Sequence, residues 1–167
     1  SFWSNMEIRG EKSLYKKLFL KKNIRSLDPV FEPNAMDEYL TEAGLKISEH
    51  LSAIMAGTNI KGDDILYLND ALTLNDELNL KNLTILYRHQ ILARFLGLKI
   101  KEFVNVKSLF GDPFINAKEC SAFISMWHKL EDSGISFHQL NYVVKDIDQV
   151  TKPDAMSKIE LINIKLV

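Results

Sequence analysis

Apolar residues along most of the chain recur at steps of three and four, which is the spacing of one face of an α-helix. The clearest stripe includes Leu83, Leu86, Ile91 and Phe95 and predicts the longest helix, over residues 80–96. Shorter stripes of the same kind predict further helices over 12–22, 36–43, 47–56, 63–72, 100–109, 117–132 and 137–146. The pattern therefore predicts a series of short helices.

Residues with preferences for helix ends mark several of these boundaries. Pro29 ends the first helical region, because the residue before a proline is pushed out of the helical conformation. The loop that follows is expected to be extended, with buried anchors at Val30 and Phe31. Asn116 is a suitable N-cap for the helix over 117–132. The apolar residues expected to point inward from that helix are Phe123, Ile124, Trp127 and Leu130.

The number and length of these segments predict an all-α fold, an irregular orthogonal bundle of six to eight short helices. Only 7 glycines and 4 prolines occur, which disfavours sandwiches and barrels with many tight turns.

The helical domain is predicted over residues 1–146. Residues 147–167 are predicted to form a linker and an apolar tail. The spacing of apolar residues in the tail fits a helix and a strand about equally. A start at Ser1 and an apolar end lead us to expect a piece of a longer protein.

A short pattern recurs between the predicted helices. It is a glycine, a branched apolar residue, a residue in capping position, an apolar residue, a polar residue, and an acid or amide. The copies are 44–49, 97–102 and 134–139, with a weaker copy at 59–64. The glycine is expected in the left-handed conformation that ends a helix, and the acid or amide is expected to bond back to the backbone. Each copy therefore predicts a tight helix–helix corner, with a full capping box only at Ser136 and Gln139.

The net charge of −1 averages over segments of opposite sign. Residues 1–25 hold seven basic residues and two acidic ones, whereas residues 28–79 hold eleven acidic residues and two basic ones. The near-neutral total disfavours a nucleic-acid-binding protein, which normally carries a basic excess. The opposed segments could pack together or steer a charged partner toward the protein.

The sequence contains no constellation that is typical of an enzyme or a metal site. The single cysteine, Cys120, lies among apolar positions of a predicted helix, where an inert buried thiol is expected. The 4 histidines lack zinc-motif spacing, and no glycine-rich phosphate loop or serine-nucleophile elbow occurs. Asp63 and Asp64 lie at a predicted helix start, where the helix dipole accounts for them. We therefore predict no enzymatic activity, no cofactor and no metal.

The helix over 80–96 carries the most distinctive polar residues. Arg88 is expected either to pair with an acid from residues 28–79, which would hold two layers together, or to remain in solvent. Asn82 and Thr84 match a glycosylation sequon, but a position inside a helix makes this a chance match.

Several groups of residues resemble, in the same order, motifs of the large A component of the bacterial insecticidal toxin complexes, the Tc toxins. The matching segments are 12–20 (KSLYKKLFL), 28–31 (DPVF), 80–89 (LKNLTILYRH) with 91–93 (ILA), 111–114 (GDPF), 123–127 (FISMW), and 133–135 (SGI) leading to 140–142 (LNY). The resemblance spans roughly residues 10–146. The tyrosine–arginine–histidine helix and the turn at 111–114 are its most specific parts.

The resemblance implies a segment of the α-helical shell that surrounds a pore-forming channel in a homo-pentamer. The implied partners are the rest of a larger chain, the B and C subunits of the toxin complex and, indirectly, a host-cell receptor. Membrane contact would come only from other parts of the full protein, and the family has no catalytic residues to transfer. The residues with an implied structural or interaction role are Tyr87, Arg88, His89, Asp112, Pro113, Phe114 and Trp127.

Two functions follow as hypotheses. The first is a non-enzymatic structural segment of a secreted toxin component, although these residues contain no visible signal peptide. The alternative is a receptor- or partner-binding helical module that uses the basic residues from Lys12 to Arg25 or the acidic segment 28–79. Because the family opens in response to pH, a pH-sensing role is expected for a histidine. The candidates are His50, His89, His128 and His138.

Overall fold

The computed structural model describes residues 3–136 and residue 139. These residues form seven α-helices and one 3-10 turn, and their only β-type pairing is an isolated antiparallel bridge between Lys46 and Glu77. The predicted all-α class and number of helices are thus confirmed. The chain divides into two compact units, residues 1–103 and 104–167, and each is considered by itself. Apart from residue 139, the helix predicted over 137–146 and the segment predicted over 147–167 lie outside the described residues.

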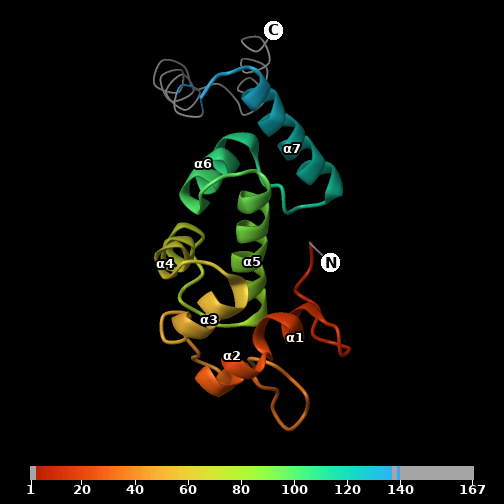
Figure 1. Ribbon diagram of the computed structural model, residues 1–167, viewed down its shortest axis with the longest axis vertical. Helices are drawn as coiled ribbons and strands as arrows, with labels where there is room; N and C mark the ends of the chain where they lie inside the picture. The colour runs from red at the N-terminus through yellow and green to blue at the C-terminus, as the bar shows by residue number, and fades with distance from the viewer. Residues whose placement is uncertain (1–2, 137–138, 140–167) are drawn as a thin grey trace. The chain divides into compact units, whose positions relative to one another are not determined.

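Most of the helices follow one another through short connections, whereas residues 32–50 form a long connection before the third helix (Figure 1). In chain order they are α1 (Leu14–Phe19), α2 (Lys22–Leu27), the turn η1 (Pro29–Phe31), α3 (Leu51–Thr58), α4 (Gly62–Ala71), α5 (Leu80–Phe95), α6 (Ile100–Phe110) and α7 (Ala117–Asp132). In the first unit, α3 contacts α1, α2 and α4. The predictions for the helices that became α4, α5, α6 and α7 are confirmed to within one residue at each end.

The helix predicted over 12–22 is present but shorter, as α1, and after the extended residue Lys21 the chain forms a second helix, α2, that was not predicted. On one continuous helix, Ile24 would lie about 140° around the axis from Phe19, since successive residues are about 100° apart. The break allows both side chains to be fully buried. Burial of these two side chains therefore outweighs the helical pattern of the sequence.

The helix predicted over 36–43 is wrong, and these residues form turns in which Asp37 has a left-handed backbone with φ of 58°. The cause is Asn34. Its side-chain oxygen accepts hydrogen bonds from the backbone N–H groups of Met36 and Glu38, at 2.9 and 3.0 Å. Turns of this kind compete with a helix for the same backbone donors.

The helix predicted over 47–56 begins instead at Leu51. The residues before it are bonded to the distant loop between α4 and α5. The N–H of Ile47 donates to the carbonyl of Asp76 at 3.0 Å. The N–H and hydroxyl of Ser48 both donate to the Asp76 carboxylate, at 2.9 and 2.6 Å. This long-range partner satisfies the donors of Ile47 and Ser48 outside the helix.

Asn82, in the first turn of α5, holds that loop. Its side-chain amide, in a residue that is 6% exposed, donates to the carbonyls of Leu74 and Glu77 at 3.1 and 2.8 Å. From α4, the side-chain oxygen of Asn69 accepts from the N–H of Asp76 at 2.9 Å. Buried carbonyls without donors are costly, so these amides fix the loop. Asn82 also lies within a helix, and its side-chain amide is hydrogen-bonded. This agrees with the prediction that the glycosylation sequon at Asn82 is a chance match.

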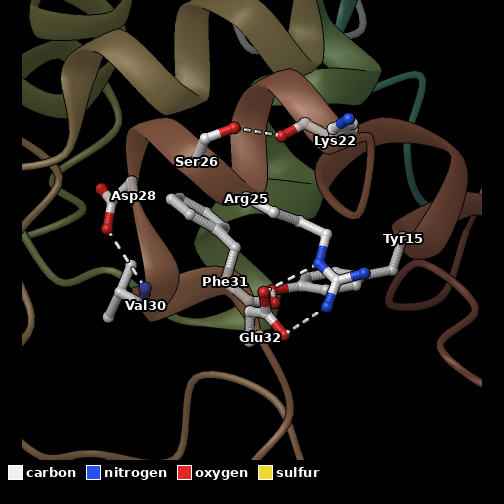
Figure 2. Close-up of polar contacts among 8 residues, drawn as sticks. All are labelled: Tyr15, Lys22, Arg25, Ser26, Asp28, Val30, Phe31 and Glu32. Atoms are coloured by element: carbon white, nitrogen blue, oxygen red, sulfur yellow. Dashed lines mark hydrogen bonds and ion pairs between the residues drawn. The ribbon is translucent and has the colours of Figure 1, made fainter.

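An aromatic cluster forms the core around α1. Ring centroids of Tyr15 and Phe19 are 5.3 Å apart, Tyr15 and Tyr39 are 4.6 Å apart, and Phe19 stacks on Phe31 at 4.8 Å. The hydroxyl of Tyr15 donates to the carbonyl of Phe31 at 3.0 Å (Figure 2). From α3, Gly57 approaches so closely that an added Cβ would lie 2.5 Å from the Phe19 ring. Any larger residue at Gly57 would therefore displace this cluster.

Polar contacts hold the corner after α2 (Figure 2). The guanidinium of Arg25 donates two hydrogen bonds to the Glu32 carboxylate, at 2.7 and 2.9 Å. This hydrogen bonding lowers the pKa of Glu32 and raises the pKa of Arg25. Oδ1 of Asp28 accepts from the N–H of Val30 at 3.1 Å and starts the 3-10 turn. Of the two predicted anchors, Phe31 is confirmed as fully buried, whereas Val30 is half-buried.

The left-handed residues predicted at the corners are confirmed. These are Gly44, Gly97 and Gly134, with φ of 84°, 69° and 69°, and Asn59 with φ of 59°. The copy at 44–49, however, joins no two helices, since no helix directly precedes Gly44 and α3 begins only at Leu51. At the end of α5, the N–H of Gly97 donates to the carbonyl of Arg94 at 3.2 Å. The N–H of Leu98 donates to the carbonyl of Ala93 at 2.9 Å. These paired bonds are the Schellman motif, which satisfies the last carbonyls of a helix.

The capping side of the corners follows the prediction at two copies. The N–H of Ser136 donates to Oε1 of Gln139 at 2.9 Å, and the N–H of Gln139 donates to Oγ of Ser136 at 3.3 Å. At the second copy, the N–H of Lys99 donates to the Glu102 carboxylate at 3.0 Å. In the copy at 44–49 the acid instead forms an ion pair with the lysine side chain at 3.3 Å.

In the second unit, α7 begins and packs as predicted. The side chain of Asn116 accepts a hydrogen bond from the N–H of Glu119 at 3.0 Å and caps the helix. Three of the residues predicted to point inward are buried and the fourth, Ile124, is half-buried; the three are Phe123, Trp127 and Leu130. None of the described helices combines the length and apolar character that crossing a bilayer requires.

We predict that Asn82→Ala lowers the free energy of unfolding by about 2 kcal/mol, because the carbonyls of Leu74 and Glu77, in a buried and a part-buried hydrogen bond, lose their donor. The measurement is urea denaturation followed by circular dichroism. Asn105→Ala removes an exposed amide from α6 and is the matched control. The control should change stability by less than about 0.5 kcal/mol. An equally small loss for Asn82→Ala would contradict the proposed role of this amide.

Alkaline pH is expected to destabilise the first unit through Tyr15. Burial, and then the neighbouring Tyr39, raise the pKa of the Tyr15 phenol far above its ordinary value. When folding raises the pKa of a tyrosine, the group contributes its full stabilisation at pH values below its pKa in the unfolded chain, about 10. This contribution to the free energy of unfolding is lost as the pH rises further. We expect the free energy of unfolding to fall above about pH 10, and less steeply in Tyr15→Phe. Identical pH dependence of urea denaturation in both proteins would rule this out.

Candidate functional site

Tyr87, Arg88 and His89 lie in the middle of α5. His89 is 1% exposed, and its Nδ1 lies 2.7 Å from the carbonyl of Ile85, to which it must donate because a carbonyl only accepts. The ring also meets Phe103 edge-on, with centroids 5.6 Å apart. Tyr87 and Arg88 are half-buried. The His89 ring thus packs inside the first unit, and the pairing of Arg88 with an acidic residue stays a prediction.

The turn after α6 contains the next three residues named by the resemblance. Gly111 has φ of 93°, and Oδ1 of Asp112 accepts from the N–H of Phe114 at 3.0 Å. Nζ of Lys107 lies 3.7 Å from the Asp112 carboxylate and 5.4 Å from the centroid of the Phe114 ring. Pro113 and Phe114 are buried. The carboxylate of Asp112 therefore helps to close a turn that anchors an aromatic side chain.

Trp127 lies on the buried face of α7, in the second unit. Next to it along that face, Phe123 meets Phe110 edge-on, with centroids 5.8 Å apart. Among the described residues, the indole N–H of Trp127 has no hydrogen-bond acceptor. The residues named by the resemblance thus belong to both units, with His89 packed inside the first and Pro113, Phe114 and Trp127 buried in the second.

The reactive side chains lie in ordinary surroundings. Cys120 is half-buried on α7, and burial raises the pKa of its thiol, which disfavours the nucleophilic thiolate. Asp63 and Asp64 occupy the first turn of α4, where the helix dipole favours negative charge. Within residues 3–136 and 139, no group of three or more histidine, cysteine or acidic side chains could hold a metal ion. His138 lies outside these residues.

A histidine–aspartate pair joins the 3-10 turn to the start of α3. Nδ1 of His50 lies 2.6 Å from Oδ2 of Asp28, and the two side chains are only 18% and 16% exposed. The His50 ring also meets Phe31 edge-on at 6.3 Å. This pair was not predicted from the sequence. An aspartate before a proline is a recognisable capping signal, but no sequence pattern indicates a partner 22 residues away.

The basic residues at the start of the chain form an exposed face on α1 and α2. Its exposed lysines are Lys12, Lys17, Lys21 and Lys22. No ion pair within the described part of the chain involves these four lysines. Arg25, by contrast, is paired with Glu32. The use of this face by a binding partner stays a prediction.

A cleft of about 740 Å³ lies in the first unit and is lined largely by charged residues. Its walls are the corner at 59–64, the corner at 97–102, and Gln90 and Arg94 of α5. We call it the charged cleft. It brings together two copies of the repeated corner pattern that are far apart in the sequence.

Comparison of the chain with protein-family models, characterised proteins and solved structures gave no match. The resemblance to the Tc toxin A component therefore depends on the residues quoted from the sequence. Functional inference depends on those residues and on the geometry of the described helices.

The pair of His50 and Asp28 should contribute measurably to stability. We expect Asp28→Asn and His50→Gln each to lower the free energy of unfolding by about 1 kcal/mol. Since both remove the same contact, the double variant should lose about 1 kcal/mol less than the sum of the single losses. Chemical denaturation of all four proteins provides this double-mutant cycle. Strictly additive losses would show that the two side chains do not interact in solution.

Proposed function

We propose that this chain is a non-enzymatic structural segment of the α-helical shell of a pore-forming insecticidal toxin component. The observation that carries the proposal is that five of the segments resembling the A component each place an aromatic ring in the core. From different matching segments, Tyr15, Phe31, His89, Phe114 and Trp127 are all buried. Residues with this placement determine how helices pack, which supports an architectural role.

The polar atoms of the matching segments support the same role. Nδ1 of His89 donates within its own helix, Asp112 closes a turn, and the hydroxyl of Tyr15 donates to a backbone carbonyl. A catalytic or metal-binding role would need such groups to converge on a space where a substrate or ion could lie. In this chain they are engaged in local and core contacts, so the resemblance is best explained by shared packing.

In this role the chain works as part of a larger polypeptide and of a homo-pentamer. The shell encloses and protects the channel, so the segment contributes rigid helical surface, while membrane contact comes from other parts of the protein. The B and C subunits of the complex and a host-cell receptor are partners of the whole assembly. The proposed location is outside the producing cell.

The proposal is tested by electron microscopy of the protein translated from the complete reading frame that contains these residues. We expect a five-fold assembly with a central channel, in which the densities of α1 to α7 lie in the outer shell. The seven helices and their connections provide a distinctive pattern to fit at side-chain resolution. A monomer, or an assembly in which these helices line the channel, would overturn the proposal.

A further inference from the structure

The charged cleft combines small-molecule size with an unusual lining. Its volume of about 740 Å³ lies within the range of ligand-binding clefts. As in most such clefts, the walls expose more apolar than polar surface, but they also include four basic and three acidic residues. The basic residues are Lys61, Arg94, Lys99 and Lys101, and the acidic residues are Asp63, Asp64 and Glu102. A ligand that suits this lining combines a charged group with a neutral remainder.

Backbone geometry fixes the two walls. Asn59 and Gly97 are both left-handed, and each is followed by an apolar residue and then by a lysine next to a helix start. The side chain of Gln90 donates to the carbonyl of Asn59 at 3.3 Å, which ties α5 to the corner between α3 and α4. The lysines Lys61 and Lys99 therefore occupy corresponding positions on two walls that are anchored to the same helix.

The charges of the cleft are not equally available to a ligand. The Glu102 carboxylate already accepts from the N–H of Lys99, and Nζ of Lys101 lies 5.3 Å from the centroid of the Tyr67 ring. Lys61, Arg94 and Lys99 take part in no ion pair within the described part of the chain. Three cationic side chains from separate segments thus remain to meet a ligand.

We propose that the charged cleft binds a small molecule through a tetrahedral oxyanion, a phosphate or sulfate group. An arginine donates pairs of hydrogen bonds to such a group, and lysines add point charges on flexible stems. Lys61, Arg94 and Lys99 provide this combination. Asp63 and Asp64, on the same wall as Lys61, weaken the attraction for the anion and can accept from hydroxyl groups on the rest of the ligand. The site therefore selects a phosphate or sulfate ester with a neutral, hydroxylated remainder.

Nuclear magnetic resonance of the 15N-labelled 167-residue protein tests this site. The probes are inorganic phosphate, inorganic sulfate and glycerol 3-phosphate, each added at pH 7 and constant ionic strength. We expect saturable shifts of the amides of Lys61, Arg94 and Lys99, with the tightest binding for glycerol 3-phosphate. Shifts that rise linearly without saturation, or that centre on α1 and α2, would overturn the proposal.

Paired variants separate this site from general attraction between charges. Arg94→Gln with Lys99→Gln should weaken glycerol 3-phosphate binding at least about tenfold, since charge-assisted hydrogen bonds are lost. The matched control, Lys17→Gln with Lys22→Gln, removes the same charge from the exposed face of α1 and α2 and should retain wild-type affinity. Equal weakening in both pairs would contradict a specific site.

A third variant tests the site even if the first pair fails to fold. Asp63→Asn with Asp64→Asn removes two negative charges and should tighten binding of inorganic phosphate several-fold, because the repulsion is lost. Unchanged or weaker phosphate binding would contradict the proposed placement of the anion. These experiments use the 167-residue chain alone, so their outcome is independent of where the segment lies in any larger assembly.

Discussion

The two hydrogen bonds from the buried amide of Asn82 determine much of the first unit. They hold the carbonyls of Leu74 and Glu77, and so they fix the loop between α4 and α5 against the helix that follows. Asp76, in the same loop, then bonds to Ile47 and Ser48 and sets the residue at which α3 begins. A polar side chain in α5 thus influences the start of a helix about thirty residues earlier, because buried backbone groups must find partners.

Short helices make such contacts necessary. α1 and α2 have six residues each, and isolated helices of this length are unstable in water, since nucleation costs more than a few hydrogen bonds return. Burial of their apolar side chains compensates for this, most clearly in the aromatic cluster around Phe19. The close approach of Gly57 shows how tightly α3 is fitted to that cluster. The stability of these helices therefore comes from tertiary packing.

The functional residues show a similar division. Most segments that resemble the Tc toxin component contribute at least one buried side chain to the core, so they describe how the chain folds more directly than what it binds. The charged cleft, by contrast, arises where two copies of a corner pattern meet. The pattern was recognisable in the sequence as a structural device. The proposed binding role of its lysines depends on the tertiary placement of the two corners in one cleft.

Local interactions explain the features that were predicted correctly from the sequence. The helices that became α4 to α7, the N-cap at Asn116 and the left-handed residues at the corners all follow from contacts within a few positions. Tertiary structure decided the break at Lys21, the late start of α3 and the pair of His50 and Asp28. These features depend on partners or buried surfaces far along the chain. The spacing of residues in a sequence indicates which of them share a helical face. Their distant partners are determined only when the whole unit packs, because every buried polar atom must then find a hydrogen-bond partner.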